Sequence, residues 1–322
     1  MRTKSFKIAG LVIATTLALT GCTSATGDDS TGGDDVFKVA AFTAGYATPG
    51  GKSTLDLFVE RGTALGWDVT LYTSAFDYDK INSDMQAAIN QGVDAVLAGF
   101  PDPRQITPLV NAANEAGIPI FSIDGGVVQN DDFVVDITFK QQQLAELTVG
   151  AMGGLEGKDV MVIGHDPHIG IMTRSNLAAD MLEEAGANIA GGEMKQVLNP
   201  GTSREEALKF VTDYLQANPD SLDGVWVGWD DAALGAVQAI EEAGRDDIFV
   251  TGIDALGIAA VEIEKDGPFV GSVFQNWSAV VDSMTDLMGA YAEDGTLPTE
   301  KFVEVDGELI DLSNVADFTP TI

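Results

Sequence analysis

From Val36 onward the sequence alternates short apolar runs with segments of helical spacing, and this alternation constrains the fold more than any other feature. The runs are typical of buried strands, and between them apolar residues recur every three or four positions. Strand–helix–strand succession implies right-handed crossovers and a parallel sheet covered on both faces. We predict strands at 37–42, 67–72, 95–99, 118–123 and 133–137, then at 160–163, 189–191 or shortly after, 225–227, 248–253 and 270–273.

The two series of strands have the same rhythm, and 322 residues are enough for about two domains. The remaining tail holds a helical segment at 278–291 and a strand at 302–305, which is too short for a third domain. Ser203 with Glu206 three residues later indicates a capping box at one helix start. The expected fold class is therefore α/β, with two doubly wound parallel-sheet lobes.

Charge excludes two classes of partner. The chain has 50 Asp and Glu against 17 Lys and Arg, a net charge of −33. Nucleic acid and anionic membrane surfaces both need basic patches, so neither is an expected partner. An acidic surface is typical of a soluble, exported protein.

The N-terminal segment indicates export. Residues 1–21 combine early basic residues with an apolar run too short for a bilayer span, as in a signal peptide. The segment 19–22, Leu-Thr-Gly-Cys, resembles a bacterial lipobox, which would make Cys22, the only cysteine, the lipidated N-terminus. The alternative is a buried thiol near an ordinary cleavage site. Residues 22–35 are rich in Gly, Ser, Thr and Asp and should form a flexible acidic linker. We therefore expect a soluble body outside the cytoplasm, held to the bacterial cell membrane by lipid alone.

Several local motifs, in order, resemble the sugar-binding branch of the type I periplasmic binding proteins, the ribose-binding-protein-like family of ABC import. The resemblance covers about residues 36–310. The matching segments are Ala-Leu-Gly-Trp at 64–67, Ala-Gly-Ile-Pro-Ile at 116–120 with Ile-Asp at 123–124, Trp-Asp-Asp-Ala-Ala-Leu-Gly-Ala at 229–236, Val-Thr-Gly-Ile-Asp at 250–254 and Gly-Ser-Val-Phe-Gln at 271–275.

The resemblance implies two lobes joined by a three-strand hinge, with a ligand trapped between them. It places the crossings near 136–140, 269–275 and 300–305. The expected N-terminal lobe is 36–137 plus about 275–300, and the expected C-terminal lobe is 138–274 plus about 301–322. Ligands of open α/β sheets bind beyond the carboxyl ends of the strands, which agrees with a site in this crevice.

Four polar residues are the first candidates for the ligand site. The resemblance makes Asp124 and Asp254 acceptors for ligand hydroxyls, although Asp124 could be a turn residue and Asp254 an N-cap. Arg174 is expected in the first turn of a helix, where the dipole disfavours a cation unless acidic groups or ligand oxygens face it. Its alternative is a surface salt bridge. Gln275 lies at a crossing and could reach the cleft or make a hinge hydrogen bond.

The sequence departs from the family pattern at two places. The family's first loop usually carries aromatic residues that stack on the sugar, but Gly50 and Gly51 stand there, and Tyr46 or the stem of Lys52 could contact the ligand instead. Trp229 replaces an expected asparagine and could supply the stacking from the other lobe, or belong to the core. Further candidates at strand ends are Phe100, Asp102, His165, His168 and Asp230.

Rival chemistries find little support. The glycines before Lys52-Ser53 lack the spacing of a phosphate-binding loop, because Gly45 stands one residue too far away. His165 and His168 lack a third strong metal ligand nearby in sequence. No Gly-x-Ser-x-Gly elbow is present, so we expect no enzyme, no cofactor and no metal.

The expected function is that of a monomeric lipoprotein that binds a monosaccharide or sugar alcohol and delivers it to the permease subunits of an ABC importer. An alternative in the same fold is a receptor for a nucleoside or a furanosyl autoinducer. An exported glycoside hydrolase is the alternative from another class, since carboxylates alone do not distinguish binding from catalysis. A transcription regulator of this fold would need an N-terminal helix-turn-helix where the signal peptide stands.

Overall fold

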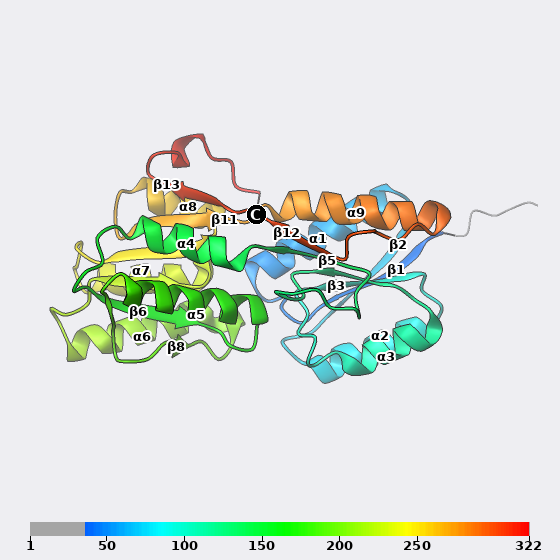
Figure 1. Ribbon diagram of the computed structural model, residues 1–322, viewed down its shortest axis with the longest axis horizontal. Coiled ribbons are helices and arrows are strands. Elements are labelled where there is room, and N and C mark those ends of the chain that lie inside the picture. The colour runs from blue at the N-terminus through cyan, green and yellow to red at the C-terminus, as the bar shows by residue number, and fades with distance from the viewer. Residues whose placement is uncertain (1–35, 322) are drawn as a thin grey trace, which may run out of the picture. The chain divides into compact units, whose positions relative to one another are not determined.

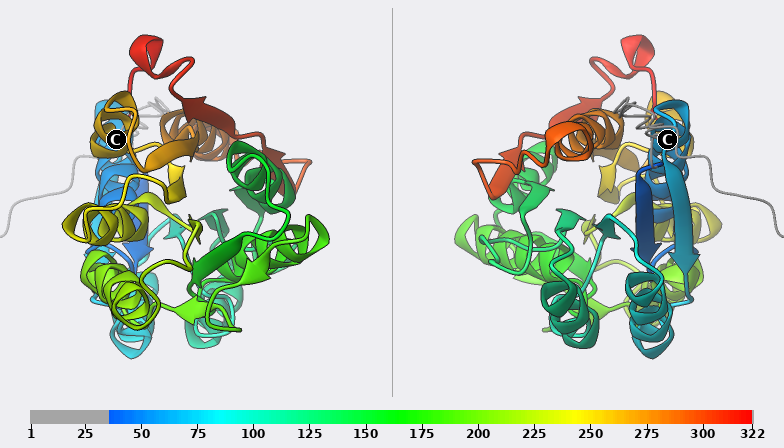
Figure 2. Two further views of the ribbon diagram at one scale, coloured as in Figure 1. Left: turned by 90° about the vertical axis from the view of Figure 1, so that its left-hand side faces the viewer. Right: turned by 90° about the vertical axis from the view of Figure 1, so that its right-hand side faces the viewer.

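A computed structural model describes residues 36–321 and shows two sheets with helices on both faces (Figures 1 and 2). The signal peptide, Cys22 and the acidic linker, all predicted for residues 1–35, lie outside the described residues. Within 36–321, no helix is both long and apolar enough to cross a membrane.

The first sheet is entirely parallel and has the strand order β12-β5-β4-β3-β1-β2. Its strands are β1 (Lys38–Thr43), β2 (Asp68–Thr73), β3 (Ala95–Gly99), β4 (Ile120–Ile123), β5 (Val135–Phe139) and β12 (Phe302–Val305). Its helices are α1 (Pro49–Ala64), α2 (Tyr78–Asn90), α3 (Thr107–Ala116) and α9 (Trp277–Asp294). We call this unit the first lobe.

Residue alternation in β1 explains why helices cover both faces. Val39 and Ala41 join one apolar cluster with side chains of α1 and α9. Ala40 and Phe42 point to the opposite face and join another cluster with side chains of α2 and α3. A strand that is apolar at every position must be buried on both sides, and Figure 1 shows α1 and α9 on one side of the sheet and α2 and α3 on the other.

The second lobe repeats this plan, with strand order β13-β11-β10-β9-β6-β7, and β8 also pairs with β6. Its strands are β6 (Asp159–Gly164), β7 (Asn188–Ile189), β8 (Lys195–Gln196), β9 (Gly224–Val227), β10 (Phe249–Asp254), β11 (Phe269–Phe274) and β13 (Glu308–Asp311). Its α-helices are α4 (Gln141–Ala151), α5 (Ile169–Glu184), α6 (Ser203–Ala217), α7 (Asp230–Glu242) and α8 (Gly257–Glu264), and short 3-10 helices span Pro200–Thr202 and Val315–Asp317. Only β13 runs antiparallel to its neighbour.

The chain crosses between the lobes after β5, after β11 and after β12. The prediction that residues from about 301 belong to the second lobe is wrong for β12, because Phe302–Val305 pair in parallel with β5 of the first sheet. The third crossing is therefore at Asp306 and Gly307, later than predicted. There Lys140 Nζ contacts Asp306 Oδ1 at 2.7 Å, which ties the first crossing to the third.

The predicted capping box at Ser203 is also wrong. The N-cap of α6 is Thr202. The Glu206 carboxylate instead accepts the N–H groups of Leu198 at 2.8 Å and Asn199 at 3.1 Å. Ser203 Oγ instead donates a hydrogen bond to Asp231 Oδ2 at 2.9 Å, which links α6 to the first turn of α7.

Gly235 allows α6 and α7 to pack at backbone contact. A Cβ atom at this position would lie 2.0 Å from the carbonyl oxygen of Arg204, so the two helices would have to separate. We expect Gly235→Ala to lower the free energy of unfolding by about 1–3 kcal/mol or more, as overpacking does. Gly150 in α4 is the control, because a Cβ there meets nothing within 4 Å. Urea unfolding should show that Gly150→Ala gains about 0.5–1 kcal/mol. Equal effects of the two substitutions would contradict this account of the packing.

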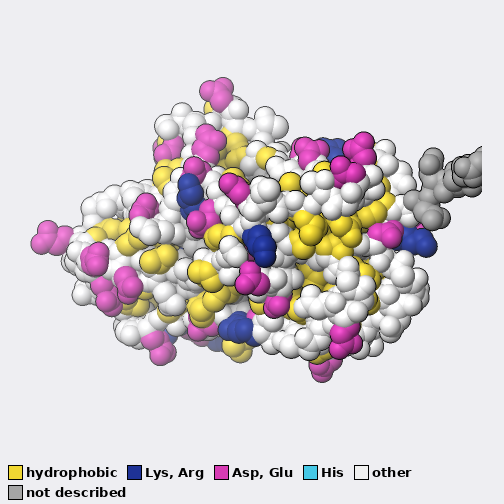
Figure 3. All heavy atoms as spheres, turned by 45° about the vertical axis from the view of Figure 1, so that its right-hand side comes forward, with side chains coloured by type: hydrophobic (Ala, Val, Ile, Leu, Met, Phe, Trp, Pro, Cys, Tyr) yellow, Lys and Arg dark blue, Asp and Glu magenta, His cyan; other side chains and the backbone are white. Residues whose placement is uncertain are grey.

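Acidic side chains are scattered over the face shown in Figure 3 and do not gather in one patch. On this face, the acidic charge therefore does not mark a binding site.

Candidate functional site

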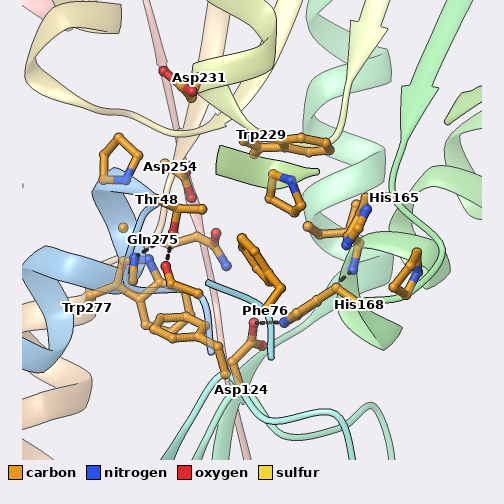
Figure 4. A pocket seen from close by; sticks show the side chains of 18 of the residues that line it. Thr48, Phe76, Asp124, His165, His168, Trp229, Asp231, Asp254, Gln275 and Trp277 are labelled. Carbon is orange, nitrogen blue, oxygen red and sulfur yellow. Dashed lines mark hydrogen bonds and ion pairs between the residues drawn. The ribbon is translucent and has the colours of Figure 1, made fainter. Parts of the chain in front are cut away.

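A cavity of about 380 Å³ lies between the lobes and is lined by residues of both (Figure 4). Its walls come largely from the segments that follow the carboxyl ends of the strands, as expected for a parallel sheet. The volume suits one small molecule and is too small for a polymer. Eight of the predicted site residues line it: Phe100, Asp124, His165, His168, Arg174, Trp229, Asp254 and Gln275.

Asp124 projects from the end of β4 in the first lobe. Its backbone has a φ of 57°, a left-handed conformation that costs energy for a residue with a side chain. Its Oδ1 accepts a hydrogen bond from Thr138 Oγ1 at 2.6 Å, and His168 Nε2 of the second lobe lies 3.6 Å from its Oδ2. Its side chain lies in the cavity wall, where a carboxylate can accept ligand hydroxyls, so Asp124 is more than a turn residue.

Arg174 is buried in α5, with only 3% of its surface exposed, so the alternative of a surface salt bridge is wrong. The sequence predicted Arg174 in the first turn of its helix, but it lies in the second turn of α5. Nε donates to the carbonyl of Gly228 at 2.9 Å and Nη1 to Gln141 Oε1 at 3.2 Å. Burial lowers the pKa of Arg174, and the nearby carboxylates of Asp124 and Asp254 oppose this. Among the described residues Nη2 makes no hydrogen bond and is free for a ligand.

Asp254 and Asp230 have different roles. Asp254 lines the cavity at the end of β10 with a φ of 122°, and burial raises its pKa to about 7 while Arg174 lowers it. The N-cap of α8 is Leu256, so Asp254 is not an N-cap. Asp230 is fully buried behind the cavity wall and does not line it. Its carboxyl accepts from Ser272 Oγ at 2.7 Å and from the N–H of Leu256 at 2.9 Å, so the prediction that Asp230 contacts the ligand is wrong.

Gln275 brings an unused donor into the cavity. Its Nε2 is buried and has no hydrogen-bond partner among the described residues, so it does not make a hinge hydrogen bond. Figure 4 shows this side chain pointing into the central space. A buried amide nitrogen without a partner is costly unless a ligand or water satisfies it. The Nε1 of Trp277, another residue of the wall, is also buried without a partner.

Trp229 and the two histidines complete the second lobe's wall. Trp229 lines the cavity and also packs in the apolar core of the second lobe, and its Nε1 lies 3.3 Å from Ser203 Oγ. His165 Nδ1 lies 2.8 Å from the carbonyl of Val197, and His168 caps α5. Burial lowers the pKa of both histidines and favours their neutral forms. In the described part of the chain, no group of three or more His, Cys, Asp or Glu residues could hold a metal ion.

Three other predicted contacts are wrong, because the structure places these side chains away from the cavity. Tyr46 Oη donates to Asp56 Oδ1 at 2.7 Å, and Lys52 forms an ion pair with the same carboxylate. Asp102 is held by Arg104 at 2.8 Å. Arg104 Nη2 in turn donates to the carbonyl of Pro167 in the other lobe at 2.8 Å, which bridges the two lobes. Asp102 therefore orients an interlobe contact.

Sequence reasoning missed much of the aromatic lining. Phe76, Tyr78 and Trp277 line the cavity, as do the polar residues Gln105 and Asp231. Nothing in the local sequence indicated that Phe76 lines the cavity. Its side chain is placed by a left-handed backbone conformation, with a φ of 60°, which the surrounding loop sets. Of six non-glycine residues with positive φ in the described chain, four line the cavity: Phe76, Phe100, Asp124 and Asp254. Backbone strain concentrates at functional sites, and here it marks the same cavity.

Comparisons with known proteins agree with this geometry. A family model described as a periplasmic binding protein domain matches residues 44–296, more than half of the chain. The chain is 27% identical over 275 residues to a xylitol-binding protein of Mycolicibacterium smegmatis, covering 81% of this chain and 72% of that protein. It is 25% identical over 282 residues to a D-apiose import binding protein of Actinobacillus succinogenes, covering 86% and 88%.

Among solved structures, an ABC transporter solute-binding protein from Agrobacterium vitis with bound allitol superposes with a TM-score of 0.77 at 22% identity. The alignment covers 87% of this chain and 97% of that one. At this level of identity the match speaks for the fold, and it confirms the predicted type I architecture. Family membership also implies an extracytoplasmic location. The chain belongs to the periplasmic binding protein family and is a solute-binding protein, not an enzyme.

Proposed function

We propose that this protein is the solute receptor of an ABC importer and binds a monosaccharide or sugar alcohol between its lobes. The observation that carries the proposal is the buried, unpartnered Nε2 of Gln275 facing the same cavity as Asp124, Asp254 and Arg174. Donors and acceptors that the protein does not fully satisfy converge there from both lobes and a crossing. Hydroxyl groups, which donate and accept, are the ligand groups that satisfy both kinds at once.

The charges of the cavity favour a neutral ligand. Arg174 stands among Asp124 and Asp254, and the pKa of Asp254 is raised to about 7 by burial. Asp231 is neutralised by Arg204 at 2.8 Å. Trp229, Phe100 and Trp277 offer aromatic surface for the C–H faces of a sugar. The named ligands of relatives and neighbours, xylitol, D-apiose and allitol, are of the same chemical class.

Hinge closure is the mechanism we propose for capture. A ligand that contacts Asp124 in the first lobe and Arg174 in the second stabilises the form in which the lobes are together. The Arg104–Pro167 hydrogen bond and the Asp124–His168 contact join the lobes in this structure. The three crossings confine the motion to a bend between the lobes.

The setting we propose is a monomer anchored to the bacterial cell membrane through a lipidated Cys22, with permease subunits as its protein partners. The lipobox-like segment and the acidic linker of residues 22–35 support this part of the proposal. Mass spectrometry of the membrane-extracted protein would test it by locating the acyl chains.

Calorimetry against a panel of sugars and sugar alcohols tests the function, with a nucleoside and a furanosyl autoinducer as the alternative arms. We expect Asp124→Ala to weaken binding of the tightest panel member about 10- to 100-fold, because hydrogen bonds to a charged group contribute about 1.5–3 kcal/mol. Asp286→Ala, an exposed residue of α9, is the matched control and should leave affinity unchanged.

Three results would contradict the proposal. Tight binding that survives Asp124→Ala would remove the site assignment. Turnover of a glycoside well above one equivalent would favour a hydrolase. A nucleoside released from the purified protein on mild denaturation, and identified by mass spectrometry, would replace the sugar as the ligand.

A further inference from the structure

The cavity has two chemically different ends. At the polar end, Asp124, Arg174, Asp254 and Gln275 present groups that the protein does not fully satisfy. The other end is built from residues 45–51 and Phe76 of the first lobe and from residues 198–201 of the second. We call it the apolar end, because its side chains in the cavity wall are Pro49, Phe76, Leu198 and Pro200, with Thr48 and Asp231 as the polar exceptions.

The two lobes meet at the apolar end. A Cβ atom placed on Gly201 would lie 3.5 Å from Cβ of Ala47 and 4.0 Å from Cε2 of Phe76, both in the first lobe. A Cβ atom on Gly45 would lie 3.6 Å from Cε1 of Phe76. The ring of Phe76 therefore lies next to both Gly45 and Gly201.

The polar groups near this end are already used. Thr48 Oγ1 donates to the carbonyl of Gly45 at 2.8 Å and accepts from the N–H of Gly51 at 3.2 Å. The carboxylate of Asp231, also in the wall, accepts from Ser203 and Arg204. These side chains have no strong polar group left to bind a ligand hydroxyl, in contrast to Gln275 at the other end.

The loop that carries Leu198 and Pro200 is fixed in place. The carboxylate of Glu206 accepts from the N–H groups of Leu198 and Asn199 and from Thr202 Oγ1 at 2.9 Å. Leu198 is 83% exposed, so its side chain is available for contact with a ligand at the rim of the cavity. A preformed apolar rim lowers the ordering cost of binding an apolar group.

Gly50 leaves space beside this rim. A Cβ atom there would meet nothing within 4 Å, whereas one on Gly51 would lie 2.4 Å from the carbonyl oxygen of Gly45. Gly51 is thus required by the backbone, while Gly50 leaves room that a side chain could fill. Gly50 is one of the residues that line the cavity, so a side chain introduced there would stand at the cavity wall.

We propose that the ligand carries an apolar substituent, an alkyl or aryl group of a few carbon atoms, on its polyhydroxylated part. This inference rests on the proposed function and specifies its ligand class. The hydroxyl groups occupy the polar end, and the substituent occupies the apolar end beside Gly50, Phe76 and Leu198. An unsubstituted sugar would leave these apolar walls in contact with water.

Matched pairs of compounds test the proposal by calorimetry. The pairs are ribose with methyl and phenyl ribofuranoside, and xylitol with its singly substituted methyl and benzyl ethers. Burial of one methylene strengthens binding about fourfold, so the best aryl derivative should bind at least about 10-fold more tightly than its parent. Gly50→Phe should fill the space and reduce the ratio of parent to derivative affinities towards one.

Gly154→Phe is the matched control, since a Cβ atom on Gly154 would also meet nothing within 4 Å and Gly154 does not line the cavity. It should leave the ratio unchanged, and thermal unfolding should confirm that both variants fold. Parents that bind as tightly as all their derivatives, with a ratio insensitive to Gly50→Phe, would overturn this inference and leave the proposed function standing. Failure of every parent and derivative to bind would overturn both.

Discussion

Arg174→Met is expected to weaken ligand binding about 1000-fold, the largest effect of any single substitution in the site. The guanidinium is 3% exposed and is held by Gly228 and Gln141 through two of its five N–H groups. The remaining donors face a cavity whose other polar groups are mostly acceptors. Loss of two hydrogen bonds from a charged group costs about 4 kcal/mol, which is three orders of magnitude in the dissociation constant. Calorimetry with the tightest ligand of the panel measures it.

Arg174→Lys separates the charge of this residue from its geometry. Lysine keeps the positive charge between Asp124 and Asp254 but lacks the planar fork that reaches several oxygens at once. We expect intermediate affinity and a melting temperature near that of the parent protein. If the Met and Lys variants bind as tightly as the parent, Arg174 is a structural residue and the site must be reassigned.

Asp136→Asn is expected to raise the free energy of unfolding relative to the parent protein. This gain should be about 4 kcal/mol larger at pH 8 than at pH 4. Asp136 in β5 is 1% exposed, and burial raises the pKa of its carboxyl from 3.8 to about 7. The hydrogen bond that the N–H of Gly125 donates to Oδ1 at 2.9 Å lowers the pKa but does not offset the burial. The folded state therefore holds a proton that the unfolded chain releases near pH 4. Stability from this group is complete below pH 4 and is lost as the pH rises to 7, at about 1.4 kcal/mol per unit. Asparagine has no charge to bury.

The measurement is the difference between variant and parent in urea unfolding at several pH values, because the other carboxyl groups then cancel. The difference should grow between pH 4 and pH 7 and level off above. Asp286→Asn on the exposed face of α9 is the control and should give a curve parallel to that of the parent. A parallel curve for Asp136→Asn as well would show that its carboxyl is ionised throughout.

The arrangement of strands and helices followed from local pattern alone. The run Val39–Phe42 is apolar at every position, which only a strand buried on both faces can use, and the structure places it inside the first sheet, between β3 and β2. The resemblance and the order of the motifs were enough to bring Asp124, Arg174, Trp229, Asp254 and Gln275 into one cavity.

Tertiary contacts decided what local pattern could not predict. Asp230 and Asp254 look alike in the sequence, as acidic residues at strand or helix ends, yet Ser272 holds one behind the wall and leaves the other in it. Phe76 reaches the cavity through a left-handed backbone that no local pattern indicates. The strand 302–305 could join either lobe by its apolar content, and its pairing with β5 decides the matter.

The placement of β12 and α9 bears on the order in which the chain can fold. The first sheet needs β12 at its edge and α9 across one face, and both come from residues 277–305, near the end of the chain. During synthesis from the N-terminus, the first sheet cannot be completed until nearly the whole chain has been made. The second sheet takes its strands from β6 to β11 in one continuous stretch and lacks only the edge strand β13. Because closing long loops slows folding, the second lobe is expected to fold before the first.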